Sequence, residues 1–213
     1  MNWLTDTFAT SIGKKLMMAI TGSCFCCFLL GHLAGNLTIY GGKDSFNAYA
    51  EHLHSLGLLI NIAETGLLIF AAVHILTGLY LFYQNLKARP VRYIVNKRAG
   101  GRTIGSSTMP YTGFIILAFV IFHLNNFHFV DKTNTTISQI VSSAFSNPVY
   151  TAIYIIAMIV VAIHVSHGFW SAFQTIGANH VKYMPFIMML SILFGLVIGI
   201  GFGFIPVYIL LIA

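Results

Sequence analysis

The stretch VYTAIYIIAMIVVAIHVSHGFWSAFQT, residues 149–175, joins a long apolar run to two histidines. As a helix it is long enough to cross about 30 Å of hydrocarbon at about 1.5 Å per residue. Four further stretches share this length and character, and they cover residues 16–40, 58–86, 111–130 and 184–213. We therefore expect an all-α membrane protein, with five transmembrane helices in a single integral-membrane domain over residues 1–213.

The composition of the chain agrees with this expectation. Hydrophobic residues make up 57% of the 213 residues and charged residues only 8%, whereas a soluble domain carries about 25% charged residues. The first apolar run has some features of a signal peptide, but no small-residue cleavage site follows it, so we interpret it as a retained transmembrane helix. Residues 41–55, between the first two runs, are expected to hold a short surface helix.

The basic residues are distributed unevenly between the two sides of the predicted membrane domain. Nine of the eleven fall on the side of the N-terminus: Lys14, Lys15, Lys87, Arg89, Arg92, Lys97, Arg98, Arg102 and Lys182. Only Lys43 and Lys132 fall on the other side. Since cytoplasmic loops are enriched in Lys and Arg, we expect a multi-pass protein of the bacterial inner membrane with a cytoplasmic N-terminus. This topology accounts for the net charge of +6 without nucleic acid. The same basic face could bind anionic membrane lipids or a soluble partner.

The three cysteines, Cys24, Cys26 and Cys27, lie close together in the first apolar run. Their spacing fits neither an iron–sulfur nor a zinc pattern. We interpret them as small packing residues of a membrane helix.

Each of the first four apolar runs contains a histidine near or within its membrane part. Ionisable groups at membrane depth are costly and usually face a functional interior. At about 1.5 Å per residue, His32 lies ~25 Å and His74 ~20 Å from the inner face. On the same reasoning His123 lies near the outer face and His164 in the inner half. The four histidines therefore define two levels, with His32 and His123 outside and His74 and His164 inside.

Two imidazoles at one level can ligate the iron of a b-type haem from both sides. Gly78 and Gly168 follow the inner histidines by four residues, on the same helix face, and would leave room for a flat macrocycle. Gly31 and Gly35 flank His32 in the same way. His167 shares a face with His164 but has no such glycine, so we expect it beside the haem or its propionates rather than on the iron.

Other readings of these histidines remain open. A buried histidine in a membrane helix is often an interhelical hydrogen-bond partner, and a transporter with packing histidines and no cofactor would show the same residues. Zinc is disfavoured because cysteines and carboxylates are missing at the two levels.

Six motifs carry a family resemblance. They are SIGKKLMMAITG, GHLAGNL, FNAYAEHLHSLG, HILTGLYL, FHLNNFHF and HVSHGFWSAFQTIG, and they span nearly the whole chain. Together they resemble the di-haem cytochrome b membrane anchor subunit of succinate dehydrogenase and fumarate reductase, the cytochrome b558 family. The main alternative is the di-haem cytochrome b anchor of another respiratory enzyme, such as a hydrogenase or a formate dehydrogenase, which usually has four helices and a different histidine arrangement.

The resemblance implies a four-helix haem-binding bundle within the five helices, and two b haems. His32 and His123 would be the axial ligands of the outer haem, and His74 and His164 those of the inner haem. The implied partners are a flavoprotein subunit with covalent FAD and an iron–sulfur subunit, docked on the basic cytoplasmic face. Electrons would pass between the iron–sulfur subunit and menaquinone, or another quinone, near the outer haem.

Quinone chemistry also moves protons, so nearby carboxylates and imidazoles are candidates for the quinone site. The candidates are Glu64, inside the second run, and Glu51, His52 and His54 in the loop before it. Alternatively, Glu64 only bonds a neighbouring helix and the loop residues face water. Candidates for contacts with the inner-haem propionates are Lys87, Arg89 and Lys182.

Two further features concern the last two runs. Some fumarate reductases of the family have a glutamate two residues before the fourth-helix ligand, where this chain has Ala162. We hypothesise that the chain lacks that transmembrane proton route, so that quinol oxidation near the outside would move charge across the membrane. The sequence IGIGFGF, residues 198–204, is typical of close helix–helix packing through small residues.

Overall fold

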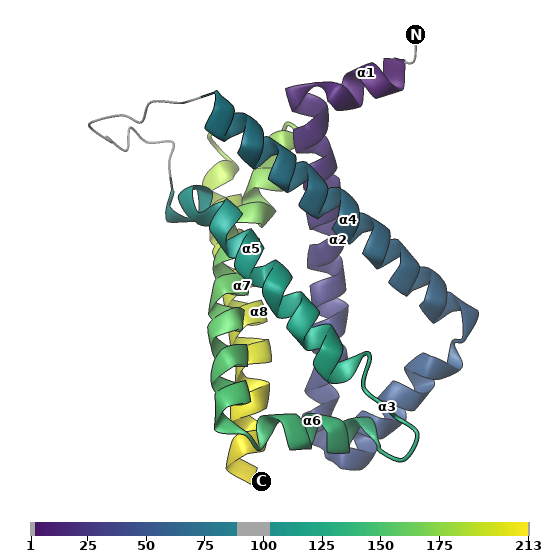
Figure 1. The fold of residues 1–213 in the computed structure, drawn as a ribbon. Coiled ribbons are helices and arrows are strands. Elements are labelled where there is room, and N and C mark those ends of the chain that lie inside the picture. Colours follow the sequence, from purple (N-terminus) through teal and green to yellow (C-terminus); the bar gives the residue numbers. More distant parts are fainter. Residues whose placement is uncertain (1–2, 89–102, 213) are drawn as a thin grey trace.

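The computed structural model of the chain describes residues 3–88 and 103–212, and within these ranges every regular element is helical (Figure 1). The elements in chain order are α1 (Trp3–Ala9), α2 (Ser11–Leu37), the 3-10 helix η1 (Thr38–Gly41), α3 (Lys43–Ser55), α4 (Leu58–Lys87), α5 (Ile104–Phe127), α6 (Ile137–Phe145), α7 (Pro148–Thr175) and α8 (Met184–Ile212).

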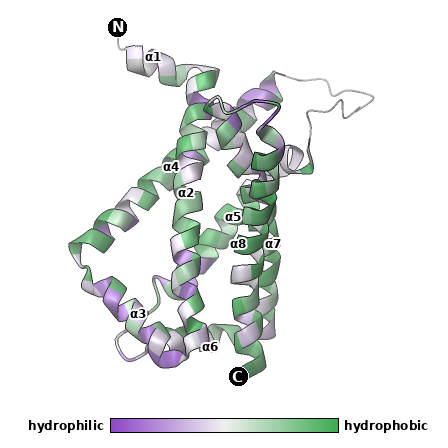
Figure 2. Cartoon of the chain, turned by 180° about the vertical axis from the view of Figure 1, so that it is seen from behind, coloured by the Kyte–Doolittle hydropathy of each residue, from purple (hydrophilic) through white to green (hydrophobic). Residues whose placement is uncertain are grey.

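The prediction of five membrane-spanning helices is confirmed. The segment Ser11–Gly41 and helices α4, α5, α7 and α8 are each long and apolar enough to cross a membrane. The two termini lie at opposite ends of the bundle, with α3 and α6 at the C-terminal end (Figure 1). Apolar residues cover the long helices, and α3 carries many of the hydrophilic ones (Figure 2). The chain is therefore a multi-pass membrane protein.

The boundaries of the third span differ most from the expectation. Helix α5 begins at Ile104 rather than near residue 111, and it ends at Phe127 rather than 130. Its start is fixed by a capping box, in which the Thr103 hydroxyl accepts from the Ser106 amide at 3.0 Å and Ser106 Oγ accepts from the Thr103 amide at 3.0 Å. Pro110 lies inside this helix. The predicted span began only after this proline, at residue 111, although prolines are tolerated in membrane helices.

Helices α3 and α6 form a layer at the C-terminal end of the bundle. The expected surface helix within residues 41–55 is confirmed as α3, whereas α6 was not predicted. Thr136 and Gln139 cap α6 reciprocally, and the Ser138 amide donates to Asn47 Oδ1 of α3 at 3.0 Å. Phe46 of α3 and Phe145 of α6 are buried in one apolar cluster with side chains of α7 and α8. This layer connects the ends of the spans at the C-terminal end of the bundle.

Helices α7 and α8 form the most extensive helix pair, and glycines bring them close. A Cβ on Gly195 would lie 2.8 Å from the Ala162 carbonyl oxygen, and one on Gly199 would lie 2.8 Å from the Ala162 Cβ. The interpretation of residues 198–204 as a small-residue packing segment is confirmed. Helices α4 and α5 are less enclosed, because each has a single fully buried residue among those described, Thr77 and Thr112 respectively.

The α7–α8 seam predicts a position-specific effect of adding one methyl group. In Gly195→Ala the new Cβ meets backbone and must displace a helix, so we expect a loss of about 1–3 kcal/mol of stability, typical of overpacking. The matched control is Gly66→Ala on α4, where a Cβ meets nothing within 4 Å. Thermal unfolding of both variants in detergent tests this. Equal melting temperatures would contradict the tight seam, since both changes gain the same helix propensity.

Candidate functional site

The predicted outer pair of histidines meets inside the bundle. His32 of α2 and His123 of α5 have ring centroids 6.0 Å apart and perpendicular ring planes. Aromatic side chains surround them: Phe28 stacks on His32 at 5.2 Å, and Phe127 lies 5.2 Å from His123. His123 Nδ1 is buried and has no hydrogen-bond partner within residues 3–88 and 103–212.

The separation of this pair suits a shared metal ion. A bond from a metal to an imidazole nitrogen is about 2 Å long, so a metal between two opposed imidazoles holds the ring centroids about 6 Å apart. The observed 6.0 Å agrees with this value. Perpendicular planes are compatible, because each ring can rotate about its own bond to the metal. The apolar, aromatic surroundings suit a porphyrin rather than a free ion, which would need polar ligands.

The predicted inner pair, His74 of α4 and His164 of α7, lies within the range of electrostatic interaction, without the direct ring contact that His32 and His123 make. Each ring is held by a threonine of a neighbouring helix. His74 Nδ1 lies 2.9 Å from the Thr21 hydroxyl of α2, and His164 Nδ1 lies 2.9 Å from the Thr112 hydroxyl of α5. The two hydrogen bonds therefore repeat the same arrangement on the two sides of the inner level.

These threonine contacts decide which ring nitrogen carries the proton. A hydroxyl has one proton, and Thr21 donates it to the Met17 carbonyl at 2.7 Å, whereas Thr112 donates to the Thr108 carbonyl at 3.1 Å. When the hydroxyl donates to its own helix, its oxygen can only accept from the ring, and we therefore predict that Nδ1 of each histidine is the protonated nitrogen. The lone pair is left on Nε2, which makes no hydrogen bond to a described residue. This is the tautomer that a metal requires of a ligating histidine.

A Thr–Gly dipeptide supports each inner histidine, and sequence reasoning missed both. Gly22 follows Thr21 and Gly113 follows Thr112; a Cβ on these glycines would lie 3.5 Å from His74 Cε1 and 3.7 Å from His164 Cε1. The signal was present in the sequence as a Thr–Gly pair in the first and third spans. It could have been found by comparing the two spans with each other, because each pair precedes the span's histidine by the same number of residues.

The glycines singled out from the sequence have different surroundings. A Cβ on Gly168 or Gly31 would meet nothing within 4 Å, and one on Gly78 would lie 3.6 Å from the Met18 methyl group. These three positions retain the expected space. The expectation for Gly35 is wrong, because a Cβ there would overlap the ring of Tyr49 from α3. The space beside Gly35 is therefore filled by the Tyr49 side chain and is not open to a macrocycle.

His167 of α7 packs against the start of α5, where a Cβ on Gly105 would lie 2.7 Å from the His167 Cβ. Its Nδ1 is 3.4 Å from the Thr103 hydroxyl, and its ring packs edge-on against Trp170 at 5.0 Å. It is close enough to His164 for their charges to interact. This position fits the expected supporting role, which stays a prediction.

Polar groups also border the outer pair. Asn36 Nδ2 donates to the His32 carbonyl at 2.8 Å and lies 3.5 Å from His32 Nδ1. Asn126 donates to the Tyr154 hydroxyl at 3.2 Å, and the Tyr154 ring lies 6.1 Å from that of His123. Both asparagines were missed, although each lies one helical turn after an outer histidine.

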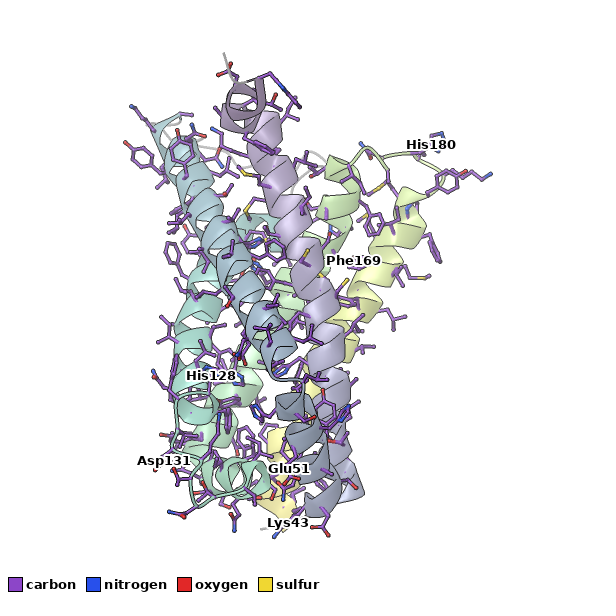
Figure 3. The ribbon with its side chains drawn as sticks, turned by 90° about the vertical axis from the view of Figure 1, so that its right-hand side faces the viewer. Lys43, Glu51, His128, Asp131, Phe169 and His180 are labelled. Carbon is purple, nitrogen blue, oxygen red and sulfur yellow. The ribbon has the colours of Figure 1, made fainter. Side chains whose placement is uncertain are left out.

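The four predicted quinone residues do not gather in the structure. Glu51, His52 and His54 are exposed on α3, whose buried face is formed around Phe46; Figure 3 shows Glu51 at the same end as Lys43 and Asp131, opposite His180. Glu64 is exposed near the start of α4 and bonds no described residue of a neighbouring helix. Their part in a quinone site stays a prediction.

The three predicted propionate residues lie outside the interior of the bundle or outside the described residues. Lys87 is exposed at the end of α4, and Lys182 is exposed with its Nζ 5.7 Å from the Tyr183 ring centroid. Arg89 lies outside the described residues. Ala162 packs against α8, because a Cβ on Gly195 would lie 2.8 Å from its carbonyl oxygen and one on Gly199 would lie 2.8 Å from its Cβ.

Other potential ligands are separate from the two pairs. The three cysteines of α2 are free thiols. In the part of the chain that the structure describes, no three His, Cys, Asp or Glu side chains come together as a metal cluster. Comparisons with protein-family models, with curated proteins and with solved structures found no match to the chain.

The threonine contacts predict the protonation of the inner histidines. Solid-state NMR of ¹⁵N-histidine-labelled protein without any bound ligand should show His74 and His164 protonated at Nδ1. Thr112→Val removes the acceptor, so the His164 signal should shift toward the other tautomer while that of His74 stays unchanged. Thr112→Ser keeps the hydroxyl and should leave the His164 signal as in the wild type. A His164 protonated at Nε2 in the wild type would contradict the assignment.

Proposed function

We propose that the chain is the membrane anchor and electron-transfer subunit of a succinate dehydrogenase or fumarate reductase complex. It would hold two b haems and pass electrons between an iron–sulfur subunit and menaquinone or another quinone. The observation that carries the proposal is the pair formed by His32 and His123, whose ring centroids lie 6.0 Å apart. His74 and His164, from the other two spans, lie within electrostatic range of each other, and each contacts a threonine of a neighbouring span.

The residues present fit a bis-histidine haem at both levels. His32 and His123 would hold one haem, and His74 and His164 the other. Bound there, the haems would supply two one-electron carriers in series across the membrane. The chain's own part is to orient the imidazoles and to exclude water. Thr21 and Thr112 keep the inner Nε2 atoms unprotonated, and the aromatic residues around the outer pair provide an apolar enclosure.

The orientation in the bacterial inner membrane is part of the proposal. Described basic residues at the N-terminal end, Lys14, Lys15, Lys87 and Lys182, outnumber Lys43 and Lys132 at the other end. Under the positive-inside rule the N-terminal end faces the cytoplasm. The inner pair would then lie nearer the cytoplasmic partners, an iron–sulfur subunit and a flavoprotein with covalent FAD.

An open apolar groove of about 450 Å³ lies between α2 and α4, and we propose that a quinone could lie against it. Cys24 and Cys27 line one wall, and Ala63 and Gly66 belong to the other. Its volume falls within the usual range of about 300–1,000 Å³ for small-molecule sites. The groove would accept an isoprenoid chain. Glu64 follows the lining residue Ala63 in the sequence.

The haem proposal predicts a defined loss for each ligand. Purified wild-type protein should show the reduced-minus-oxidised spectrum of haem b, with two haems per chain. His123→Ala and His164→Ala should each lose about half of the haem, because each removes an axial ligand from one pair. The haem is quantified by the pyridine haemochrome assay.

Matched controls are His128→Ala and His180→Ala, because both histidines are exposed. These variants should keep both haems. A wild-type protein without haem absorption, made under haem-sufficient conditions, would contradict the proposal and favour a histidine-packed transporter.

The nature of the partner separates the proposal from the alternative of a hydrogenase or formate dehydrogenase anchor. The five spans favour the succinate dehydrogenase or fumarate reductase class, because the alternative anchors usually have four. Affinity purification from the native membrane should recover a subunit with covalent FAD. Recovery of a nickel or molybdenum subunit instead would support the alternative.

A further inference from the structure

Lys14 of α2 is a buried cation at the N-terminal end of the bundle. Only 8% of its surface is exposed, whereas the adjacent Lys15 is exposed. Its Nζ donates to Gln84 Oε1 of α4 at 3.1 Å and lies 4.6 Å from the Tyr80 ring centroid. Within residues 3–88 and 103–212 it forms no ion pair.

The contacts of Lys14 leave its charge unbalanced. An amide oxygen and an aromatic face interact favourably with an ammonium group, but neither carries a negative charge. Burying a charge without an opposite charge is costly, so buried cations are normally paired with anions. Among the described residues, Lys14 has a hydrogen-bond acceptor and an aromatic face but no counter-ion, so an external anion could complete its surroundings.

A cavity beside Lys14 provides the space for such an anion. It has a volume of about 320 Å³, and its walls include Phe8 and Ala9 at the end of α1, Met17 of α2, and Thr77 and Tyr80 of α4. Lys14 is itself part of the wall. The cavity is therefore apolar over much of its wall, with one cation and one buried hydroxyl.

The cavity also borders the inner histidine site. Lys14 precedes Thr21 by two helical turns, about 10.5 Å of rise, on the same face of α2. Thr77 lies one turn after His74 on α4. Two anions can reach this place: the propionate of a haem held by the inner pair, and the phosphate of an anionic phospholipid at the membrane surface. Both present anionic oxygens.

We propose that Lys14, together with Gln84 and Tyr80, forms a binding site for an anionic oxygen group, a carboxylate or a phosphate, between α2 and α4. The carboxylate source rests on the proposed haem function, whereas the phosphate source does not. If the anion is a haem propionate, Lys14 would be a further residue in the role that the sequence suggested for Lys87, Arg89 or Lys182.

The test compares Lys14→Gln with Lys15→Gln, a matched control that removes an equal charge one residue away. In the lipid arm, thermal unfolding is measured in nanodiscs of phosphatidylcholine with and without phosphatidylglycerol. In the haem arm, the midpoint potentials of the two haems are measured by redox titration. Lys15→Gln should behave as the wild type in both arms.

If the anion is the lipid phosphate, Lys14→Gln loses the rise in melting temperature that phosphatidylglycerol gives the wild type. If it is the haem propionate, the potential of one haem falls in Lys14→Gln, because the unbalanced carboxylate favours the oxidised iron. Either result supports the site and identifies its source. A folded Lys14→Gln that matches Lys15→Gln in both arms overturns the proposal.

A second variant covers the case in which Lys14→Gln does not fold. Gln84→Glu places a carboxylate where the Gln84 amide oxygen lies 3.1 Å from the Lys14 ammonium. This carboxylate should take the place of the external anion while the lysine remains. We then expect no rise in melting temperature with phosphatidylglycerol, or a lower potential of one haem, as in Lys14→Gln. Retention of the wild-type effect in this variant overturns the site. A wild type without haem would refute the proposed function but leave the lipid arm decisive.

Discussion

Everything in this bundle depends on how polar side chains are accommodated in a hydrocarbon environment. A polar atom without a partner costs several kcal/mol when no water is at hand. The chain meets this constraint at the inner level with threonine hydroxyls that already donate to their own helices and therefore accept from Nδ1 of His74 and His164. At the outer level it leaves His123 Nδ1 buried without a described partner. Thr21 and Thr112 thus hold the rings of His74 and His164, whereas His123 Nδ1 has no such support.

The helices differ in how tightly they pack against their neighbours. Helices α7 and α8 meet through glycines and form the dense part of the molecule. Helices α4 and α5 bury little against their neighbours, with only Thr77 and Thr112 fully enclosed among their described residues. Thr112 directly bonds a histidine. A bundle that is rigid on one side and open on the other can admit a large flat ligand without unfolding its core.

Much of the fold could be predicted from the sequence, because long apolar runs leave few alternatives to membrane helices. The two levels of histidines followed from counting residues along those helices. The start of α5 did not, because a capping box at Thr103 outweighs the apparent break at Pro110. Thr21 and Thr112 were missed because a threonine in one apolar run has no distinctive pattern by itself, and the repeated Thr–Gly spacing is seen only when the first and third spans are compared. Lys14 was missed because a lysine next to Lys15 gives no sign of burial, which depends on Gln84 and Tyr80 from another helix.

The Thr–Gly pairs have a consequence for the origin of the molecule. Residues of α2–α4 and α5–α7 repeat one unit: a long helix with Thr–Gly and then a histidine, a short cap helix, and a second long helix with a histidine. Each threonine bonds the second histidine of its own unit, whereas each histidine couple draws one member from each unit. The architecture resembles two copies of one helical hairpin, and the histidine couples exist only when the two copies pack against each other. An ancestral homodimer of one such hairpin would already have possessed both couples.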